Sequence, residues 1–543
     1  GSRPRRARPP RAPHPEALVS ARRPVALALL ITACGSSRSV VPVPPHVDPT
    51  VLQRMQPVIA PPTPREPLRV VELRNESSTL VTFRVVLHAG SADDPQGREG
   101  LTRLLVRLMT EGGTQALPYE DFTRRLFPMA ATLRYEVDRD MTVITAQVHR
   151  DHVTAFYPLL RDVVLTPRLG ASDFERVRTQ SLADLRLELR GSSDETLGKE
   201  VLQSLVYDGH PYGHPPVGTE RALEAATVED VRAHHRNLFC TARLSIGLAG
   251  AYPEALVDTV RGDMATLPAT CATTVTLATP TRPHGLHVVI VDKPTASATA
   301  ISLGFPVAIT RRDDDFAALQ LATHHLGLHR QSVGVLYQTI REARGLNYGD
   351  YAYAEHFEQE PGTRFPRPNV LRRQQYASVW IRPVPARAAH FALRAALRAV
   401  DRVVREGVAQ DDIARVRGFL DGYVGLYTQT ESARLGYALD DVVSGWTSGA
   451  GLTRLRERWA TLTEAQVRDV TQRNLTAQDA WVAIVAPNAR ELAQAIGSNA
   501  PSPITYDSPK DPEVLAEDRE IVAWPLAVRP EDVRVVPLAE VFR

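Results

Sequence analysis

One order of predicted elements occurs twice along the chain, and this constrains the fold more than any other feature. In the first half, two apolar strand patterns precede an amphipathic helix that starts at Gly100. In the second half, two strand patterns precede a helix at 315–328. A chain of 543 residues is also too long for one hydrophobic core. We therefore expect an α+β fold of two homologous domains, each a mixed sheet with helices on one face.

The two halves share this order without an obvious sequence repeat. Strand patterns occur at 68–72, 80–87, 131–135, 141–149, 244–249, 287–291, 299–305, 349–357, 374–383 and 481–485. Further helical patterns occur at 119–126, 152–164, 172–190, 333–344, 386–405, 409–427 and 430–446. Ser172 with Glu175 three residues later predicts a capping box. The domains are expected at 67–280 and 281–497, before a Pro-rich C-terminal extension at 498–543 to which no structure is assigned.

The overall composition is that of a soluble globular protein. It is 43% hydrophobic and 23% charged, and its formal net charge is +2. A charge so close to zero gives no argument for binding nucleic acid or an anionic membrane surface. We therefore expect no nucleic-acid partner.

The N-terminal segment has the features of a secretory signal over residues 1–34. Its first 23 residues are rich in arginine, and a short apolar run then ends at Cys34. The run has roughly 10 apolar residues, too few for a membrane-spanning helix. Residues 31–36 resemble a bacterial lipobox, in which Cys34 becomes the lipidated N-terminus; the alternative is a free cysteine in an ordinary signal peptide. The Pro-rich residues 35–66 suit an extended tether.

These features predict a lipoprotein on the periplasmic side of a cell envelope, with membrane contact only through its lipid anchor. Two further cysteines, Cys240 and Cys271, could pair in such an oxidising compartment, but spacing alone does not show their geometry. Neither has nearby zinc ligands. We interpret them as two separate small core residues.

The helix that starts at Gly100 carries the most specific pattern in the chain. Residues 100–114 read GLTRLLVRLMTEGGT, and they resemble the active-site helix of the pitrilysin/insulinase family of zinc peptidases. In that family the helix carries the inverted motif His-x-x-Glu-His. Arg103, Val106 and Arg107 stand at the His, Glu and His positions. Arginine has no lone pair for a cation and valine cannot activate water, so the resemblance implies a fold whose own zinc site is lost.

Other blocks extend the resemblance over about residues 67 to 500. They include the strand and turn at 85–94, the approach to a ligand-bearing helix at 166–176, the His-Pro-Tyr loop at 210–214 with Gly218, and the motif REARGLNY at 341–348. Any one block is weak, but their order and spacing together are specific. The resemblance implies half of a clam-like chamber, which is completed within one chain or by paired subunits.

The resemblance places a third zinc-ligand position at Asp184. Arg103 and Arg107 lie four residues apart on one helical face, where their like charges repel. A nearby carboxylate would offset that repulsion. We therefore hypothesise that Arg103 or Arg107 forms an ion pair with Asp184 in place of the metal. The alternative is three solvated surface charges.

Histidines elsewhere offer only incomplete ligand sets. His325 and His329 have the i, i+4 spacing of metal ligands, with His324 beside them, but no nearby carboxylate completes a site. We expect a structural or partner-facing role for them. His210 and His214 have the same spacing, but the prolines around them indicate a loop and a packing role. No metal is expected to bind this chain.

The resemblance gives a function to Arg341 and Tyr348. In the family, an Arg and a Tyr seven residues apart hold the substrate backbone and stabilise the oxyanion. A fixed cation and a neutral donor suit a place where negative charge develops. The alternative is an arginine on a helix surface and a tyrosine in the core.

These observations favour a non-catalytic subunit of a heterodimeric zinc peptidase. Such a subunit would bind a peptide or unfolded protein and bring Arg341 and Tyr348 to the zinc site of a homologous partner, which would hold the zinc. An alternative is a peptide-binding or assembly protein of the envelope without proteolysis. A lone peptidase with a different metal site is a third possibility, for which the sequence offers little.

Overall fold

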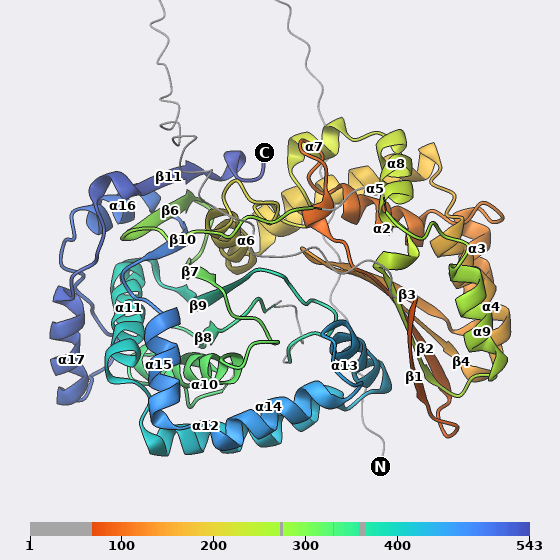
Figure 1. Cartoon of the computed structure of the whole chain (residues 1–543). Coiled ribbons are helices and arrows are strands. Elements are labelled where there is room, and N and C mark those ends of the chain that lie inside the picture. Colours follow the sequence, from red (N-terminus) through yellow and green to blue (C-terminus); the bar gives the residue numbers. More distant parts are fainter. Residues whose placement is uncertain (1–67, 272–274, 329–330, 358–364) are drawn as a thin grey trace, which may run out of the picture. The chain divides into compact units, whose positions relative to one another are not determined.

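The computed structural model describes residues 68–271, 275–328, 331–357 and 365–543 (Figure 1). The predicted signal peptide, Cys34 and the Pro-rich tether lie outside the described residues. The described chain contains two mixed sheets flanked by helices, so the predicted α+β fold class is confirmed. Within the described ranges, no helix is long and apolar enough to cross a membrane.

The first sheet has the strand order β1-β5-β2-β4-β3. Its strands are β1 (Arg69–Arg74), β2 (Leu80–Leu87), β3 (Thr132–Val137), β4 (Thr142–His149) and β5 (Leu244–Gly250). β1 runs parallel to β5, and the other neighbours are antiparallel. Alternate β2 side chains, Val81, Phe83 and Val85, belong to the core that the helices cover. This alternation is the period-two pattern of a half-buried strand.

The helices of the first half are α2 (Leu101–Glu111), α3 (Tyr119–Leu126), α4 (Val153–Leu165), α5 (Ala171–Ala183), α6 (Asp194–Val206), α7 (Glu220–Ala225), α8 (Val228–Leu238) and α9 (Ala255–Met264). The predicted capping box at Ser172 is wrong, because α5 already begins at Ala171 after Gly170 and has no side-chain cap. Ser172 therefore lies inside the first turn. α5 continues into a π-helical segment, η4 (Asp184–Ser192).

The second sheet has the order β11-β6-β10-β7-β9-β8. Its strands are β6 (Leu286–Asp292), β7 (Thr299–Val307), β8 (Asp350–Tyr353), β9 (Gln375–Val384), β10 (Ala480–Ala486) and β11 (Val533–Pro537). β11 comes from the segment to which the sequence assigned no structure, and it pairs parallel to β6. Residues beyond 497 therefore complete an edge of this sheet.

The helices of the second half are α10 (Phe316–Gly327), α11 (Ala389–Glu406), α12 (Gln410–Val424), α13 (Glu431–Val443), α14 (Ala450–Thr461), α15 (Glu464–Asn474), α16 (Ala489–Gly497) and α17 (Pro512–Ala523). The helix predicted at 333–344 is helical over 335–342, and its part from Tyr337 to Glu342 is the π-helical turn η6. Gly334 packs closely against α10, because a Cβ there would lie 2.8 Å from the Cα of Gly327.

Each sheet also receives one helix from the other half on its second face. α13 packs on β5 of the first sheet, where Leu435 and Leu439 join Val71 and Val86 in a small core. Gly247 permits this approach, because a Cβ on it would lie 2.8 Å from both leucine side chains. α6 packs reciprocally on β7 and β10. The expectation of helices on one face alone is therefore incomplete: this exchange joins the two halves.

The interpretation of Cys240 and Cys271 as separate core residues is wrong. They form a disulfide with a Cα–Cα distance of 5.3 Å across a sequence separation of 31 residues. The backbone brings them together, because the N–H groups of Thr241 and Ala242 donate to the carbonyls of Pro268 and Ala269. Such a return of the chain cannot be read from the spacing of two cysteines.

Candidate functional site

The start of α2 is fixed by a buried aspartate. The carboxylate of Asp94 accepts hydrogen bonds from the backbone N–H groups of Gly100 (2.6 Å) and Thr102 (2.7 Å), and from the Thr102 hydroxyl. Burial raises the pKa of Asp94 to about 7. Gly100 has a φ of 98°, and a Cβ there would lie 2.7 Å from the Cα of Gly218. The start of α2 therefore lies directly against the loop that contains Gly218, and a side chain at position 100 would prevent this contact.

α2 divides its side chains between the core and the ion-paired face. Leu104, Leu105 and Leu108 are buried in the core of the first half. Val106 is also fully buried, with 0% exposure. Arg103 and Arg107 lie on the other face, where their side chains are 32% and 14% exposed. The position that resembles the family's general base is therefore part of the hydrophobic core.

Both arginines reach Asp184, as the hypothesis predicts. Nη1 of Arg107 lies 2.8 Å from Oδ2 of Asp184, and Nη2 of Arg103 lies 3.5 Å from the same oxygen. Asp184 stands at the junction of α5 and the π-helical segment η4. The ion-pair prediction is confirmed, and the alternative of three separately solvated charges is wrong.

The network extends to residues that the sequence reasoning missed. Glu111 accepts from Nε of Arg107 (3.3 Å), an i, i+4 contact that is readable from the spacing. Arg176 of α5 lies 3.8 Å from the Glu111 carboxylate, a contact that only helix packing creates. Burial raises the pKa of Tyr135, which bonds to Arg103, although the two arginine charges oppose that shift. We call Arg103, Arg107, Glu111, Arg176 and Asp184 the α2 charge cluster.

The α2 charge cluster does not fit a zinc ion. Zinc takes deprotonated Cys, neutral His or carboxylate ligands, and structural sites hold four of them. At the family's three ligand positions only Asp184 has such a group, and its Oδ2 is already engaged by two guanidinium groups. Across the rest of the described chain, no three His, Cys, Asp or Glu side chains gather closely enough to hold a metal.

The histidines singled out by spacing have packing or hydrogen-bonding roles. Nδ1–H of His324 donates to the carbonyl of Gln320 at 2.7 Å, and His325 is buried in α10. His329 lies outside the described residues. His210 packs edge-on against Tyr212, with ring centroids 4.8 Å apart, which confirms its packing role. His214 hydrogen-bonds to the carbonyl of Pro215 at 3.1 Å.

Arg341 and Tyr348 point outward. Arg341 lies in the last turn of η6, with a side chain that is 39% exposed and lies 3.1 Å from its neighbour Glu342. Its guanidinium also lies over the ring of Tyr337, 5.5 Å from the centroid. Tyr348 is 83% exposed. The alternative that placed Tyr348 in the core is therefore wrong.

Residues between these two side chains anchor the segment. The Arg344 side chain is fully buried, and it pairs with Asp518 (2.8 Å) and Glu517 (2.9 Å) of α17. The Asn347 amide donates to Asp350 (2.7 Å), whose pKa burial raises to about 8. Every anchor points inward, so the outward direction of Arg341 and Tyr348 is held by a buried network.

The two groups of predicted site residues remain separate within the described chain. The α2 charge cluster belongs to the first half, whereas Arg341 and Tyr348 lie beside the edge strand β8 of the second sheet. No hydrogen bond or ion pair between described residues links the two groups. Within one chain they therefore do not form a common site through direct contacts.

Comparison with known proteins places these halves in one family. The sequence profile described as "Insulinase (Peptidase family M16)" matches residues 69–220, and the profile "Peptidase M16 inactive domain" matches 225–420. The chain belongs to the M16 insulinase family. The family resemblance read from the motifs is thereby confirmed, and the chain is a homologue of the family's zinc proteases.

Two bacterial proteins and one yeast protein illustrate the relationship. An uncharacterized zinc protease of Mycobacterium tuberculosis (strain ATCC 25618 / H37Rv) is 22% identical over 370 residues, covering 68% of this chain and 80% of the relative. Another from Streptomyces coelicolor is 22% identical over 363 residues, covering 65% and 74%. A probable mitochondrial-processing peptidase subunit beta of Schizosaccharomyces pombe is 24% identical and covers 34% of this chain and 40% of that protein.

Solved structures share the fold. A peptidase M16 inactive domain from Pseudomonas fluorescens superposes with a TM-score of 0.68 at 18% identity, covering 83% of this chain and 98% of that chain. A protease from Helicobacter pylori gives 0.65 at 14% identity, covering 78% and 98%. Both therefore extend over most of the two-sheet arrangement described above.

Proposed function

We propose that the chain is a non-catalytic subunit of an insulinase-like zinc peptidase. It binds a peptide or unfolded-protein substrate and contributes Arg341 and Tyr348 to the zinc site of a homologous partner subunit. The proposal rests on a difference between two pairs of side chains. Arg103 and Arg107 are paired with Asp184, whereas Arg341 and Tyr348 point toward solvent from a segment that the buried Arg344 anchors. Zinc in this proposal belongs to the partner.

The chemistry of the two outward side chains suits the proposed role. The Arg341 guanidinium keeps its charge at any physiological pH, and the Tyr348 hydroxyl is a neutral donor. Directed at a carbonyl oxygen of the substrate, the two groups stabilise the negative charge that develops there during attack by water. Since the buried anchors set their direction in advance, little reorganisation is needed at the moment of reaction.

One comparison supports a subunit: one relative is described as a subunit of a processing peptidase. The inactive-domain profile over residues 225–420 does not separate a subunit from a complete enzyme, because relatives described as zinc proteases align with this chain over 74–80% of their own length. The replaced motif in α2 supplies the complementary half of the argument, because a chain without zinc ligands needs a partner that has them. The two halves of this chain would then form one half of a peptidase chamber.

Metal analysis combined with reconstitution tests the proposal. The purified chain alone should contain no stoichiometric zinc and cleave no peptide. A homologous subunit with an intact His-x-x-Glu-His motif, co-expressed with it, should co-purify, hold one zinc per complex and become active only in the complex. One equivalent of tightly bound zinc in the isolated chain would refute the proposal.

A peptide-binding or assembly protein is the alternative that the same experiment separates. If a complex forms and binds peptides but no zinc-bearing subunit or cleavage is found, the outward side chains serve binding alone. The exposed positions of Arg341 and Tyr348 are compatible with that role, but they do not account for the loss of a motif specific to zinc.

We also place the protein on the periplasmic side of the cell envelope, anchored through lipid on Cys34. The Cys240–Cys271 disulfide supports an oxidising compartment, because disulfides persist there and are rare in reducing cytosol. Metabolic labelling with a radioactive fatty acid tests the anchor. Label should appear in the wild-type protein and be lost in Cys34→Ala, while Cys240→Ala should keep it.

A further inference from the structure

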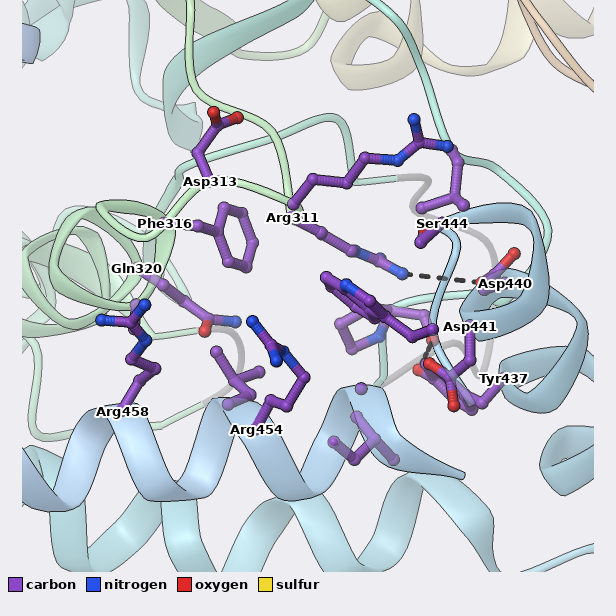
Figure 2. A pocket seen from close by; sticks show the side chains of 18 of the residues that line it. Arg311, Asp313, Phe316, Gln320, Tyr437, Asp440, Asp441, Ser444, Arg454 and Arg458 are labelled. Carbon is purple, nitrogen blue, oxygen red and sulfur yellow. Dashed lines mark hydrogen bonds and ion pairs between the residues drawn. The ribbon is translucent and has the colours of Figure 1, made fainter. Parts of the chain in front are cut away.

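A pocket lies in the second half between α10, the end of α13 and α14 (Figure 2). Its cavity has a volume of about 70 Å³, and Phe316, Leu452 and Leu455 contribute apolar wall. A single water needs roughly 10–15 Å³ by this measure, so the space exceeds one solvent molecule. Four arginines and five carboxylates line the rest of the pocket, and polar groups beside an apolar wall can fix the orientation of a small ligand.

One buried polar atom in this pocket has no partner. Gln320 is 6% exposed, and its Oε1 accepts no hydrogen bond in the described structure. Figure 2 shows the Gln320 side chain of α10 and the Arg454 side chain of α14 pointing toward one another across the pocket. A buried acceptor left unpaired costs free energy, so a ligand N–H that reaches it gains a bond with little competition.

The positive charge of Arg454 is also unmatched. Its guanidinium lies over the Trp446 ring, 5.3 Å from the centroid, but it forms no ion pair with any described residue. The stacking leaves its N–H groups available for an anion at the mouth of the pocket.

The acidic residues around the pocket are already occupied. Arg311 neutralises Glu355 at 3.0 Å and lies 3.7 Å from Asp440 (Figure 2). The remaining carboxylates pair with Arg458 (Asp314), cap the turn at Thr310 (Asp313) and accept from the N–H of Gly449 (Asp441). None of these carboxylates lies within ion-pair distance of Arg454 in the described structure.

The inner end of the pocket carries no cation. Beyond Gln320 lies a second cavity of about 30 Å³, lined by His324, Tyr353 and Tyr427. Burial lowers the pKa of His324 to about 4, so its ring is neutral at physiological pH. An anionic group is therefore favoured at the Arg454 end rather than at the inner end, where an apolar group fits.

We infer that this pocket binds an apolar carboxylate with a neighbouring N–H group, as found in the C-terminal residue of a peptide or in a free N-acylated amino acid. The carboxylate pairs with Arg454, and the N–H donates to Oε1 of Gln320. The apolar side chain packs against Phe316 and Leu452. This site is separate from Arg341 and Tyr348, and it does not depend on the function proposed for them.

Calorimetric titration of the full chain with N-acetyl-leucine tests the site. Saturable binding is expected. N-acetyl-leucinamide, which lacks the carboxylate charge, should bind at least about tenfold more weakly. Arg454→Gln and Gln320→Leu should each weaken binding about tenfold or more. Arg456→Gln is the matched control, because Arg456 lies on the same helix but pairs with Asp421 at 2.7 Å; it should bind as the wild type does.

Further outcomes identify the source of the ligand or overturn the site. Tighter binding of N-acetyl-Ala-Ala-Leu than of N-acetyl-leucine supports a peptide end, and binding of N-acetyl-leucine alone supports a free acid. No binding of either compound at millimolar concentration would overturn the inference. So would binding that Arg454→Gln leaves unchanged, and this exposed position keeps the test valid even if Gln320→Leu fails to fold.

Discussion

The arginines of the α2 charge cluster and those of the 341–348 segment differ in their burial and in their ion-pair partners. In the cluster, two guanidinium groups share one carboxylate, and a second carboxylate follows one helical turn later. In the segment, the buried arginine is Arg344, while the partners of Arg341 among the described residues are its close neighbours Glu342 and Tyr337. Charges that satisfy each other stabilise a fold, whereas a charge held outward by a buried scaffold is available to a ligand.

Both regions nevertheless share one unusual backbone feature. Asp184 begins the π-helical segment η4, and Arg341 lies in the π-helical turn η6. π-helical turns are rare and occur frequently at functional sites, because they rotate one side chain relative to a regular helix. The two regions therefore share a backbone feature and differ in the partners of the side chain: Asp184 is paired with two arginines, whereas Arg341 points toward solvent.

Breaking the buried scaffold should have the largest effect. Arg344→Met leaves the buried Asp518 without its cation and Glu517 with Arg398 alone (3.0 Å), and we expect a loss of about 3 kcal/mol in the free energy of unfolding. Amide hydrogen exchange at 341–348 should also become faster. Chemical denaturation measures the first effect, with Arg402→Met as control, because Arg402 is 58% exposed and pairs with the similarly exposed Glu406. Equal losses in both variants would contradict the scaffold role.

The scaffold should also give a pH dependence through Asp350. Burial raises its pKa to about 8, whereas the unfolded value is about 3.9. The folded state thus holds a proton that the unfolded state releases, so this contribution is full below about pH 4 and is lost as pH rises toward 8. Relative to Asp350→Asn, the wild type should lose up to about 1.4 kcal/mol per pH unit between those limits. A difference that is constant from pH 5 to 8 would exclude a buried protonated Asp350.

Opening the α2 charge cluster should have a smaller effect. Asp184→Asn removes the carboxylate that Arg103 and Arg107 share and leaves Arg107 with Glu111 alone. Because the three side chains are partly exposed, we expect a loss of about 1 kcal/mol in the free energy of unfolding. The loss should shrink in 1 M salt, where charges are screened over about 3 Å. Asp421→Asn, at an exposed pair with Arg456, is the matched control and should change stability by less. If Asp184→Asn leaves the free energy of unfolding unchanged, the α2 charge cluster does not stabilise the fold.

Local patterns predicted the elements well where one face is buried. The strand at 80–87 and the helix at 119–126 agree with β2 and α3 to the residue. The ion pair to Asp184 was also predictable, because helical spacing and the family register fix which side chains share a face. In both cases the information is local or tied to a known motif.

Contacts between distant segments could not be predicted. Arg344 meets Asp518 across 174 residues, and the sequence assigned no structure to the segment that contains α17. α6 and α13 bury apolar faces against the sheets of the opposite halves, a choice that helical periodicity does not specify. The Cys240–Cys271 disulfide depends on a backbone return of the same kind.

We propose that this chain acts through Arg341 and Tyr348 and not through its own α2 helix. Peptide turnover by the complex with a zinc-bearing partner tests it most directly. Arg341→Ala with Tyr348→Phe should lower kcat by about 10²–10³-fold while the complex and its zinc remain intact. Arg103→Met with Arg107→Met should leave kcat within about threefold of the wild type, since the cluster affects stability alone. Full turnover in the first variant, or a comparable loss in the second, would contradict the account.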